Sequence, residues 1–363
     1  MLLMAQSLSL AFPSAGGESA STSIGSAWDV SYNWRPGFGY KDNVLSSPRD
    51  AAGRAYTLLG GDASVLRLSE GHLQLYGFSS IDHLRYWDPS PARSETLAML
   101  GGEVTRTGSG PWSFGARWES VYQDQFVDLS ATEDTLSVLR ATGLSVAVRP
   151  GLEGNWNSGW RVSLELPLGR QWFDAPLDDY WEWGVSGRIR RDFESGLRLE
   201  GLMAYEHRDY DTRSGRTSRG ATLVDDPLQF DRVVWEARVR FYLDEARRWR
   251  LSNRFGYRRN RDTTGGFFDY DRWRWRGELR YQKERFQFTS IVSYSHYDYF
   301  EQRGDMASEL RSKGWWRGQL QCRLSVSEKA SVVLAYEHEF SDSNLRVDSY
   351  RGNHVSLSYD REF

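Results

Sequence analysis

The chain has 363 residues, a formal net charge of −3 and 39% hydrophobic residues, and its mean hydropathy is −0.62. No stretch approaches the roughly 20 consecutive apolar residues of a membrane-spanning helix, which argues against a helical membrane protein. The chain nevertheless carries 16 Trp, 19 Tyr and 17 Phe. So many aromatic residues in a polar chain indicate either a carbohydrate-binding β protein or a β-barrel with aromatic girdles.

The beginning of the chain is predicted to be a leader followed by a flexible segment, residues 1–26, and the folded domain is placed at 27–363. Met1–Leu10 contains an apolar run, and Ser9–Ala11 has the small residues of a signal-peptide cleavage site. No Lys or Arg precedes this run, so a true signal peptide and a partial one both remain open. Residues 13–26 are rich in Gly, Ser and Ala, which is typical of flexible segments.

Segments with a period of two residues follow one another from Ala27 onward. Residues 112–122, 160–168, 197–205 and 233–243 each place apolar side chains at alternate positions, with polar or charged residues between them. Side chains alternate between the two faces of a β-strand, so each segment has one apolar face and one polar face. Helical spacing does not fit these runs. The sequence therefore predicts a protein built almost entirely of strands.

The connectors between these segments are predicted to alternate strictly between short and long. Seven short and eight long connectors give about sixteen strands, an even number typical of bacterial transmembrane antiparallel barrels. A soluble β-sandwich, the alternative, gives no reason for such sorting. The longest connector, Asp211–Pro227, carries Arg213, Arg216 and Arg219 and is expected to narrow the mouth of the barrel. The short connectors are expected at 69–72, 108–110, 150–159, 194–196, 244–248, 283–285 and 327–329, and the long ones at 45–53, 87–93, 127–133, 173–179, 211–227, 261–268, 301–313 and 341–351.

The last strand ends the chain on an aromatic residue. Val355, Leu357, Tyr359 and Phe363 share one face of it. A terminal Phe that closes an alternating strand resembles the signal read by the barrel-assembly machinery of outer membranes, so we expect that machinery to be a partner through Phe363. Arg361 interrupts the apolar alternation, but a charge near the membrane interface costs little. An even strand count places both ends of the barrel on the periplasmic side.

The first predicted hairpin carries a resemblance to a known family. A strand that ends in Gly39–Val44 (GYKDNV), followed by a loop and a second alternating strand, resembles the opening of the outer-membrane β-barrel porins of the "porin 2" type. Related openings occur in barrels found with exopolysaccharide and surface-export systems. The likeness is sharpest over Val30–Leu45, and elsewhere only the strand rhythm matches. It implies an outer-membrane location and a pore-like role, and it implies no catalytic residues.

Closing the sheet places the apolar face against lipid and the polar face toward a water-filled lumen. Residues 272–276 (RWRWR) show this most clearly, with Arg inward and Trp outward. The residues expected in the membrane girdles are Trp118, Trp235, Trp273, Trp275 and Phe363. Those expected to line the lumen are Arg188, Arg190, Arg238, Arg240, Arg254, Arg258, Arg272, Arg274, Arg276, Arg280, Glu236 and Glu278.

Two interpretations of the inward Arg remain open. In one, they pair with inward Glu across adjacent strands and only stabilise the barrel. In the other, they form a positive wall that favours anions, for which an anionic solute or glycan is the expected partner. Fourteen Arg on these strands, which include Arg198, Arg208, Arg232 and Arg250, face five Glu, so pairing cannot neutralise all of them. The five are Glu182, Glu200, Glu206, Glu236 and Glu278, and acidic counterparts are expected to face inward on other strands at Glu119, Glu165, Glu337 and Glu339.

Catalytic and metal sites are not expected. His354 and Ser356 both face inward two residues apart, similar to the spacing in outer-membrane lipid A deacylases, but no acid follows at a suitable distance. No metal-ligand spacing is present. Asp225-Asp226 and the acids of residues 269–271 are interpreted as solvated loop residues rather than Ca²⁺ ligands. We expect no catalytic residues, no metal and no cofactor.

The leading hypothesis is a passive conduit for small polar solutes, anionic ones among them, in the bacterial outer membrane, with outer-membrane lipid as its surroundings. Two alternatives remain: an export pore for a polysaccharide, and a non-conducting structural or adhesin barrel. No nucleic-acid partner is expected. A barrel of sixteen strands is wide enough for an aqueous channel unless loops fold into it.

Overall fold

The computed structural model describes residues 28–46, 51–68, 72–88, 93–128, 138–306 and 308–363. The leader expected at 1–26 lies outside these residues. No helix in the described part of the chain is long and apolar enough to span a membrane.

The described residues form one continuous antiparallel sheet, apart from connectors and one short 3-10 helix. The alternating apolar and polar residues predicted strands, and the structure confirms them. The strands are β1 (Trp28–Lys41), β2 (Arg54–Leu68), β3 (Leu73–Tyr86), β4 (Ser94–Thr107), β5 (Trp112–Asp128), β6 (Val138–Asn155), β7 (Trp160–Glu165), β8 (Leu168–Phe173), β9 (Tyr180–Asp192), β10 (Arg198–Arg216), β11 (Thr222–Tyr242), β12 (Trp249–Asp262), β13 (Tyr270–Lys283), β14 (Phe286–Arg303), β15 (Leu310–Ser327), β16 (Ala330–Ser343) and β17 (Tyr350–Glu362), and the helix is η1 (Arg346–Asp348).

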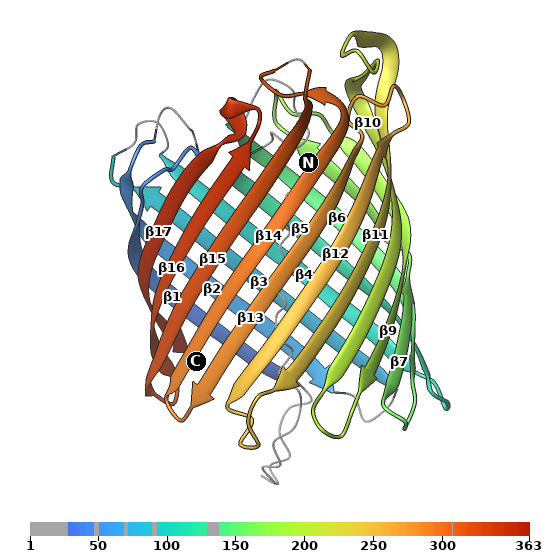
Figure 1. Ribbon diagram of the computed structural model, residues 1–363. Coiled ribbons are helices and arrows are strands. Elements are labelled where there is room, and N and C mark those ends of the chain that lie inside the picture. Colours follow the sequence, from blue (N-terminus) through green and yellow to red (C-terminus); the bar gives the residue numbers. More distant parts are fainter. Residues whose placement is uncertain (1–27, 47–50, 69–71, 89–92, 129–137, 307) are drawn as a thin grey trace.

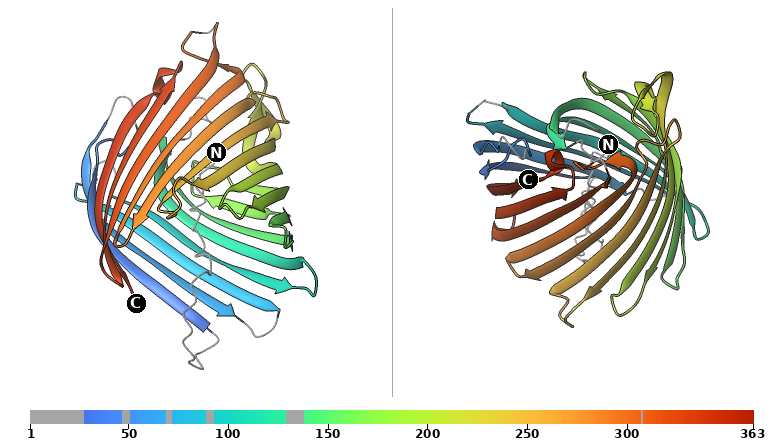
Figure 2. Two further views of the ribbon diagram at one scale, coloured as in Figure 1. Left: turned by 60° about the horizontal axis from the view of Figure 1, so that its bottom comes forward. Right: turned by 45° about the horizontal axis from the view of Figure 1, so that its top comes forward.

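The sheet closes on itself into a barrel. Apart from β7 and β8, each strand pairs with its neighbours along the chain, and β1 pairs with β17, with Phe38 opposite Leu357. Figures 1 and 2 show the strands tilted and wound around one central axis. Closure satisfies the backbone groups that an open sheet would leave unpaired at its edges. The predicted transmembrane-type antiparallel β-barrel architecture is confirmed.

The barrel has sixteen strand positions, as predicted, because β7 and β8 together occupy one of them. Both pair with β6 on one side and β9 on the other. The break between them falls at Leu166 and Pro167. Proline has no N–H to donate to a neighbouring strand, so the ladder is interrupted there. Leu166 still donates to Pro150 and Gly184 donates to the Pro167 carbonyl, each at 2.9 Å, which keeps the two halves in line.

The two faces of the sheet differ sharply in exposure. On β11, Trp235 is 51% exposed and Arg232 is 1% exposed; on β13, Trp273 is 58% exposed and Arg272 is 8% exposed. A single sheet wrapped into a barrel can bury side chains only on its concave side. The polar face therefore lines the lumen, and the apolar face covers the outside.

The connectors lie at two rims of the barrel. Those after β1, β3, β5, β8, β10, β12, β14 and β16 share the long-loop rim, and the remaining seven, with the start of β1 and the end of β17, share the short-turn rim. The sorting by length is weaker than predicted, because 217–221 at the long-loop rim is shorter than 243–248 at the other. The connector predicted at 150–159 is also shorter, because β6 continues to Asn155 and only 156–159 form the turn.

The connector predicted at Asp211–Pro227 is mostly strand. β10 and β11 extend beyond their neighbours as a hairpin that projects from the long-loop rim, and only 217–221 connect them (Figure 1). Register shifts at Asp209, Ser214 and Arg216 mark where the hairpin leaves the regular ladder. The prediction of a long loop was therefore wrong. The polar, turn-forming residues of this segment were interpreted as a loop. They form a strand pair that extends beyond the rim, where neither face is part of the barrel wall.

Inward-facing aromatic residues pack near the long-loop rim. Phe230 contacts Tyr210 and Phe268 in edge-to-face geometry, with ring centroids 6.0 and 6.1 Å apart. A second group joins Tyr270, Tyr297 and Tyr299, with centroids 5.6–6.5 Å apart. These rings occupy lumen-facing positions, so side chains of the barrel wall itself take up lumen space at this end.

Candidate functional site

The inward positions of β9–β13 are dominated by arginine, and we call this set the basic wall. The twelve residues predicted to line the lumen all occupy inward positions of these five strands. Alternation along each strand produces this arrangement, because the inward Arg residues of each strand are separated by an even number of positions. The basic wall consists of Arg188, Arg190, Arg198, Arg208, Arg232, Arg238, Arg240, Arg250, Arg254, Arg258, Arg272, Arg274, Arg276 and Arg280.

Strand register places arginines directly opposite one another. Arg254 on β12 is opposite Arg238 on β11 and also opposite Arg276 on β13. Like charges at directly opposed positions destabilise a sheet. A wall that served only to hold the barrel together would instead place each Arg opposite a Glu. Within the wall, the directly opposed pairs are Arg198–Arg240, Arg238–Arg254, Arg254–Arg276, Arg258–Arg272 and Arg250–Arg280. Beyond these, Arg190 is opposite Arg161 of β7, and Arg117 of β5 is opposite Arg149 of β6.

Some members of the wall do form ion pairs. Glu182 binds Arg208 at 2.5 Å and Arg232 at 3.2 Å. Glu278 binds Arg250 at 2.7 Å. Asp192 contacts Arg190 at 3.1 Å and also binds Arg198. Two further contacts are longer, Arg254–Glu236 at 3.8 Å and Arg188–Glu200 at 3.9 Å. The interpretation in which inward Arg pair with carboxylates and stabilise the barrel therefore holds for part of the wall.

Seven arginines of the wall have no carboxylate within 4.0 Å among the described residues. Arg258 and Arg272 are 6% and 8% exposed, yet Nε and Nη1 of Arg258 and Nε of Arg272 donate no hydrogen bond to the described protein. Buried donors normally have an acceptor. The positive charge of these side chains is therefore not offset by a hydrogen-bonded carboxylate of the described protein. The seven are Arg238, Arg240, Arg258, Arg272, Arg274, Arg276 and Arg280.

Inward carboxylates gather on a different part of the barrel, on β2–β5. In a ring of sixteen positions, β3 lies opposite β12. On these strands, only Glu119 was predicted from the sequence to face inward. The others were missed because Gly60-Gly61 and Gly101-Gly102 obscure the alternation. The inward carboxylates of β2–β5 are Asp62, Asp82, Glu95, Glu103 and Glu119.

Each of these carboxylates has a basic neighbour, in contrast to the basic wall. Representative contacts are Arg35–Asp82 and Lys41–Glu95, each at 2.7 Å. Elsewhere, the predicted inward acids Glu337 and Glu339 both contact Arg317, at 2.6 and 3.4 Å, and Glu165 contacts Arg117 at 3.4 Å. Charge is therefore locally balanced outside β9–β13. The lumen has an uncompensated positive side and an opposite side whose charges are paired.

The five residues predicted for the membrane girdles lie on the outer face. Trp118, Trp235, Trp273 and Phe363 are among the exposed large hydrophobic residues, and Trp275 shares the outward parity of Trp273. Phe363 stacks on Tyr32 with ring planes 8° apart, beside the seam between β1 and β17. Other outward rings pair across strands, including Tyr257 with Trp273. The outside is thus apolar and rich in aromatic rings.

The remaining candidate residues contact other partners than each other. His354 Nε2 makes a hydrogen bond with the Tyr56 hydroxyl, not with Ser356. Asp269 accepts a hydrogen bond from the Asp262 amide at 2.6 Å, and Asp271 binds the Tyr257 hydroxyl at 2.8 Å. Among the described residues, no three His, Cys, Asp or Glu side chains gather so as to hold a metal ion.

Comparison with known proteins shows similarity at the level of structure. No family model matches the sequence, so the resemblance to "porin 2" barrels is not confirmed, and no curated protein matches it. Among solved structures, OccAB1 of Acinetobacter baumannii is 8% identical and covers 95% of this chain and 99% of its own, with a TM-score of 0.55. The outer membrane channel DcaP of the same organism is 11% identical, covers 93% and 97%, and has a TM-score of 0.54. OccK9 of Pseudomonas aeruginosa is 12% identical, covers 93% and 98%, and has a TM-score of 0.50. At these identities the likeness establishes the shared barrel fold.

Proposed function

We propose that this chain is a passive pore of the bacterial outer membrane that conducts small polar solutes and favours anions. The membrane location is supported by the apolar, aromatic-rich exterior of a closed barrel, which is what a lipid-facing surface requires. It is also supported by the shared fold of DcaP, which is described as an outer membrane channel.

The preference for anions rests on one observation, the seven unpaired arginines of the basic wall. Fixed positive charge on the side of a narrow tube with low-dielectric walls concentrates anions near that side. Rings or walls of Arg favour anions in pores for this reason. The paired charges on β2–β5 offset each other locally, so they oppose this field only weakly. A small carboxylate or phosphate solute fits the guanidinium donors.

The alternatives have less support. No observation favours polysaccharide export, and none of the similar structures named above is described as an export pore. A purely structural barrel gives no reason to hold arginines directly opposite one another, because that arrangement costs stability. Functional sites are where a protein retains such locally unfavourable arrangements.

Reconstitution tests the proposal. The purified barrel is inserted into a planar lipid bilayer with a KCl gradient, and single-channel current is recorded. Stepwise conductance with a reversal potential of the sign set by chloride is the expected result. A properly folded barrel, verified by heat-modifiable gel migration, that gives no conductance steps would refute the pore. Conductance with a potassium-determined reversal potential would refute the anion preference alone.

A further inference from the structure

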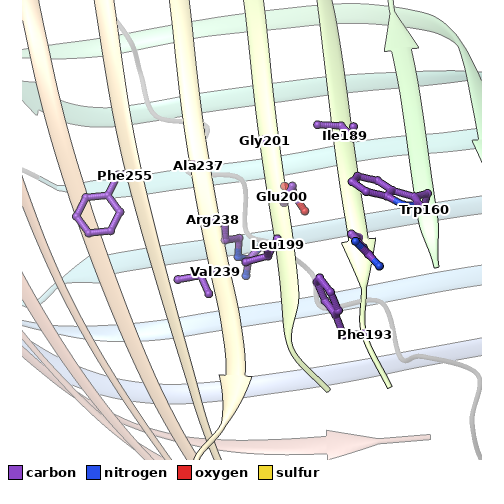
Figure 3. A pocket seen from close by; sticks show the side chains of 11 residues that line it. Trp160, Ile189, Phe193, Leu199, Glu200, Gly201, Ala237, Arg238, Val239 and Phe255 are labelled. Carbon is purple, nitrogen blue, oxygen red and sulfur yellow. The ribbon is translucent and has the colours of Figure 1, made fainter. Parts of the chain in front are cut away.

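A groove lies on the outer face of the barrel, in the half near the short-turn rim. Its volume is about 470 Å³, and outward residues of β7 and β9–β12 line most of it (Figure 3). Phe193, in the turn after β9, and parts of the inward-facing residues Glu200 and Arg238 complete the lining. Gly201 and Ala237 lie opposite each other on β10 and β11 and provide its floor. The larger residues Ile189, Leu199 and Phe255 surround this floor, and each of them is 43–56% exposed. The groove exists because two adjacent outward positions lack bulk where their neighbours have it.

An arginine stands at the end of this groove. Arg191 takes an outward position on β9, opposite Trp160 on β7 and Leu199 on β10. Its guanidinium lies over the rings of Trp160 and Phe193, 5.1 and 4.5 Å from their centroids. No described carboxylate lies within 4.0 Å of it. Aromatic stacking holds the guanidinium against the outer face and leaves its N–H groups free to donate.

Outward arginines near the two rims have different kinds of partner. Near the long-loop rim, Arg140 and Arg259 pair with Asp124 and Asp271, at 2.6 and 3.4 Å. Near the short-turn rim, Arg67 and Arg361 stack on Trp28 and Phe363 as Arg191 does on its rings, and they lack a described carboxylate partner. No outward strand position in the described short-turn half is acidic. The charged residues at described outward strand positions in this half are therefore all basic, whereas the described acidic residues of this rim lie in the turns or at inward positions.

We infer that Arg191 and the adjoining groove bind one anionic phospholipid. The head-group phosphate accepts hydrogen bonds from Arg191, and an acyl chain lies on Gly201 and Ala237. This inference rests on the membrane location proposed above. Charge complementarity favours a lipid over a second copy of the chain. A second copy has no carboxylate at an outward strand position of its described short-turn half that could accept hydrogen bonds from Arg191. Basic residues at a membrane surface attract anionic lipids, and Trp and Tyr anchor the same interface.

Native mass spectrometry of the purified, detergent-exchanged barrel tests the site. The probes are dioleoylphosphatidylglycerol, which is anionic, and dioleoylphosphatidylcholine, which has no net charge. We expect one phosphatidylglycerol to bind more tightly than phosphatidylcholine. Arg191→Gln should weaken phosphatidylglycerol binding about fivefold and remove the preference. Ala237→Phe should fill the groove and weaken both lipids, whereas Arg67→Gln, which removes a stacked arginine without an adjoining groove, should leave the tight site intact.

Three results would overturn the inference. They are equal binding of the two lipids by the wild type, wild-type affinity in Arg191→Gln, and a dimer that buries the groove and excludes lipid. Arg191→Gln keeps the test valid even if Ala237→Phe fails to fold, since the arginine is at the surface. Bilayer conductance of the same samples separates this inference from the proposed function. Lipid selectivity without conductance would refute only the pore, and conductance without lipid selectivity would refute only the lipid site.

Discussion

Glu182 Oε2 lies 3.2 Å from Nη1 of Arg232, although the two residues stand on β9 and β11 with β10 between them. The same oxygen accepts hydrogen bonds from Nε and Nη2 of Arg208 on β10, at 2.9 and 2.5 Å. One carboxylate thus serves two arginines that are 1% and 3% exposed. The contact spans three strands and ties together the part of the basic wall nearest the long-loop rim.

Glu182→Gln should therefore destabilise the barrel by about 1–3 kcal/mol, because two buried guanidinium groups lose a charged acceptor. The cost should stay below that of breaking a fully buried pair, since the Glu182 side chain is 35% exposed. Urea unfolding in lipid vesicles, followed by tryptophan fluorescence, measures it. Glu200→Gln is the control, because its contact with Arg188 is 3.9 Å long. Equal stability of the two variants would show that the Glu182 bridge contributes little.

The assignment of faces is tested at Trp235. This side chain is 51% exposed on the outer face and lies between Met203 and Tyr257 of the neighbouring strands. Trp235→Arg should cost roughly 2–4 kcal/mol if the site lies near the midplane of the membrane, and it should hinder assembly. Trp87→Arg, in the connector after β3, should be tolerated. Heat-modifiable gel migration reads out assembly, and a Trp235→Arg barrel as heat-resistant as the wild type would place Trp235 away from lipid.

Salt should weaken the selectivity of the pore. The Debye length is about 10 Å at 0.1 M ionic strength and about 3 Å at 1 M, so a charged wall acts on the centre of the lumen only in dilute salt. The ratio of anion to cation permeability should fall severalfold between those conditions at a fixed KCl gradient ratio. A ratio that does not change with ionic strength would mean that ions are selected by direct contact at a constriction rather than by the field of the wall.

The sequence was sufficient to predict the barrel and its two faces because both depend on a local pattern. Residues 272–276 alternate Arg and Trp, and the structure places the two types on opposite faces. The hairpin at Asp211–Pro227 was mistaken for a loop because it lies above the barrel wall, where neither face needs to be apolar. The break at Pro167 was equally hidden, since a strand can resume in register after it.

Which residues lie opposite each other on neighbouring strands could not be predicted from the sequence. The opposition of Arg254 to both Arg238 and Arg276 depends on the register of three strands, and register depends on turn geometry that no single strand encodes. The same holds for Glu182 reaching Arg232. Counting Arg and Glu predicted an excess of positive charge, but only the register shows which arginines have a carboxylate within reach.

The most direct test of the anion-favouring pore is to remove part of the basic wall. Replacing Arg238, Arg254, Arg274 and Arg276 together by Gln removes four inward charges. The matched control removes the same number of outward charges. It replaces Arg67, Arg106, Arg140 and Arg259 by Gln.

Reversal potential in a KCl gradient across a planar bilayer, at 0.1 M or less on the dilute side, is the measurement. The inward variant should shift toward cation selectivity while the outward variant keeps the wild-type value, because only the inward charges act on ions in the lumen. Inward-variant channels that insert normally and retain the wild-type reversal potential would contradict the account, since the arginines would then support the barrel and not the solute.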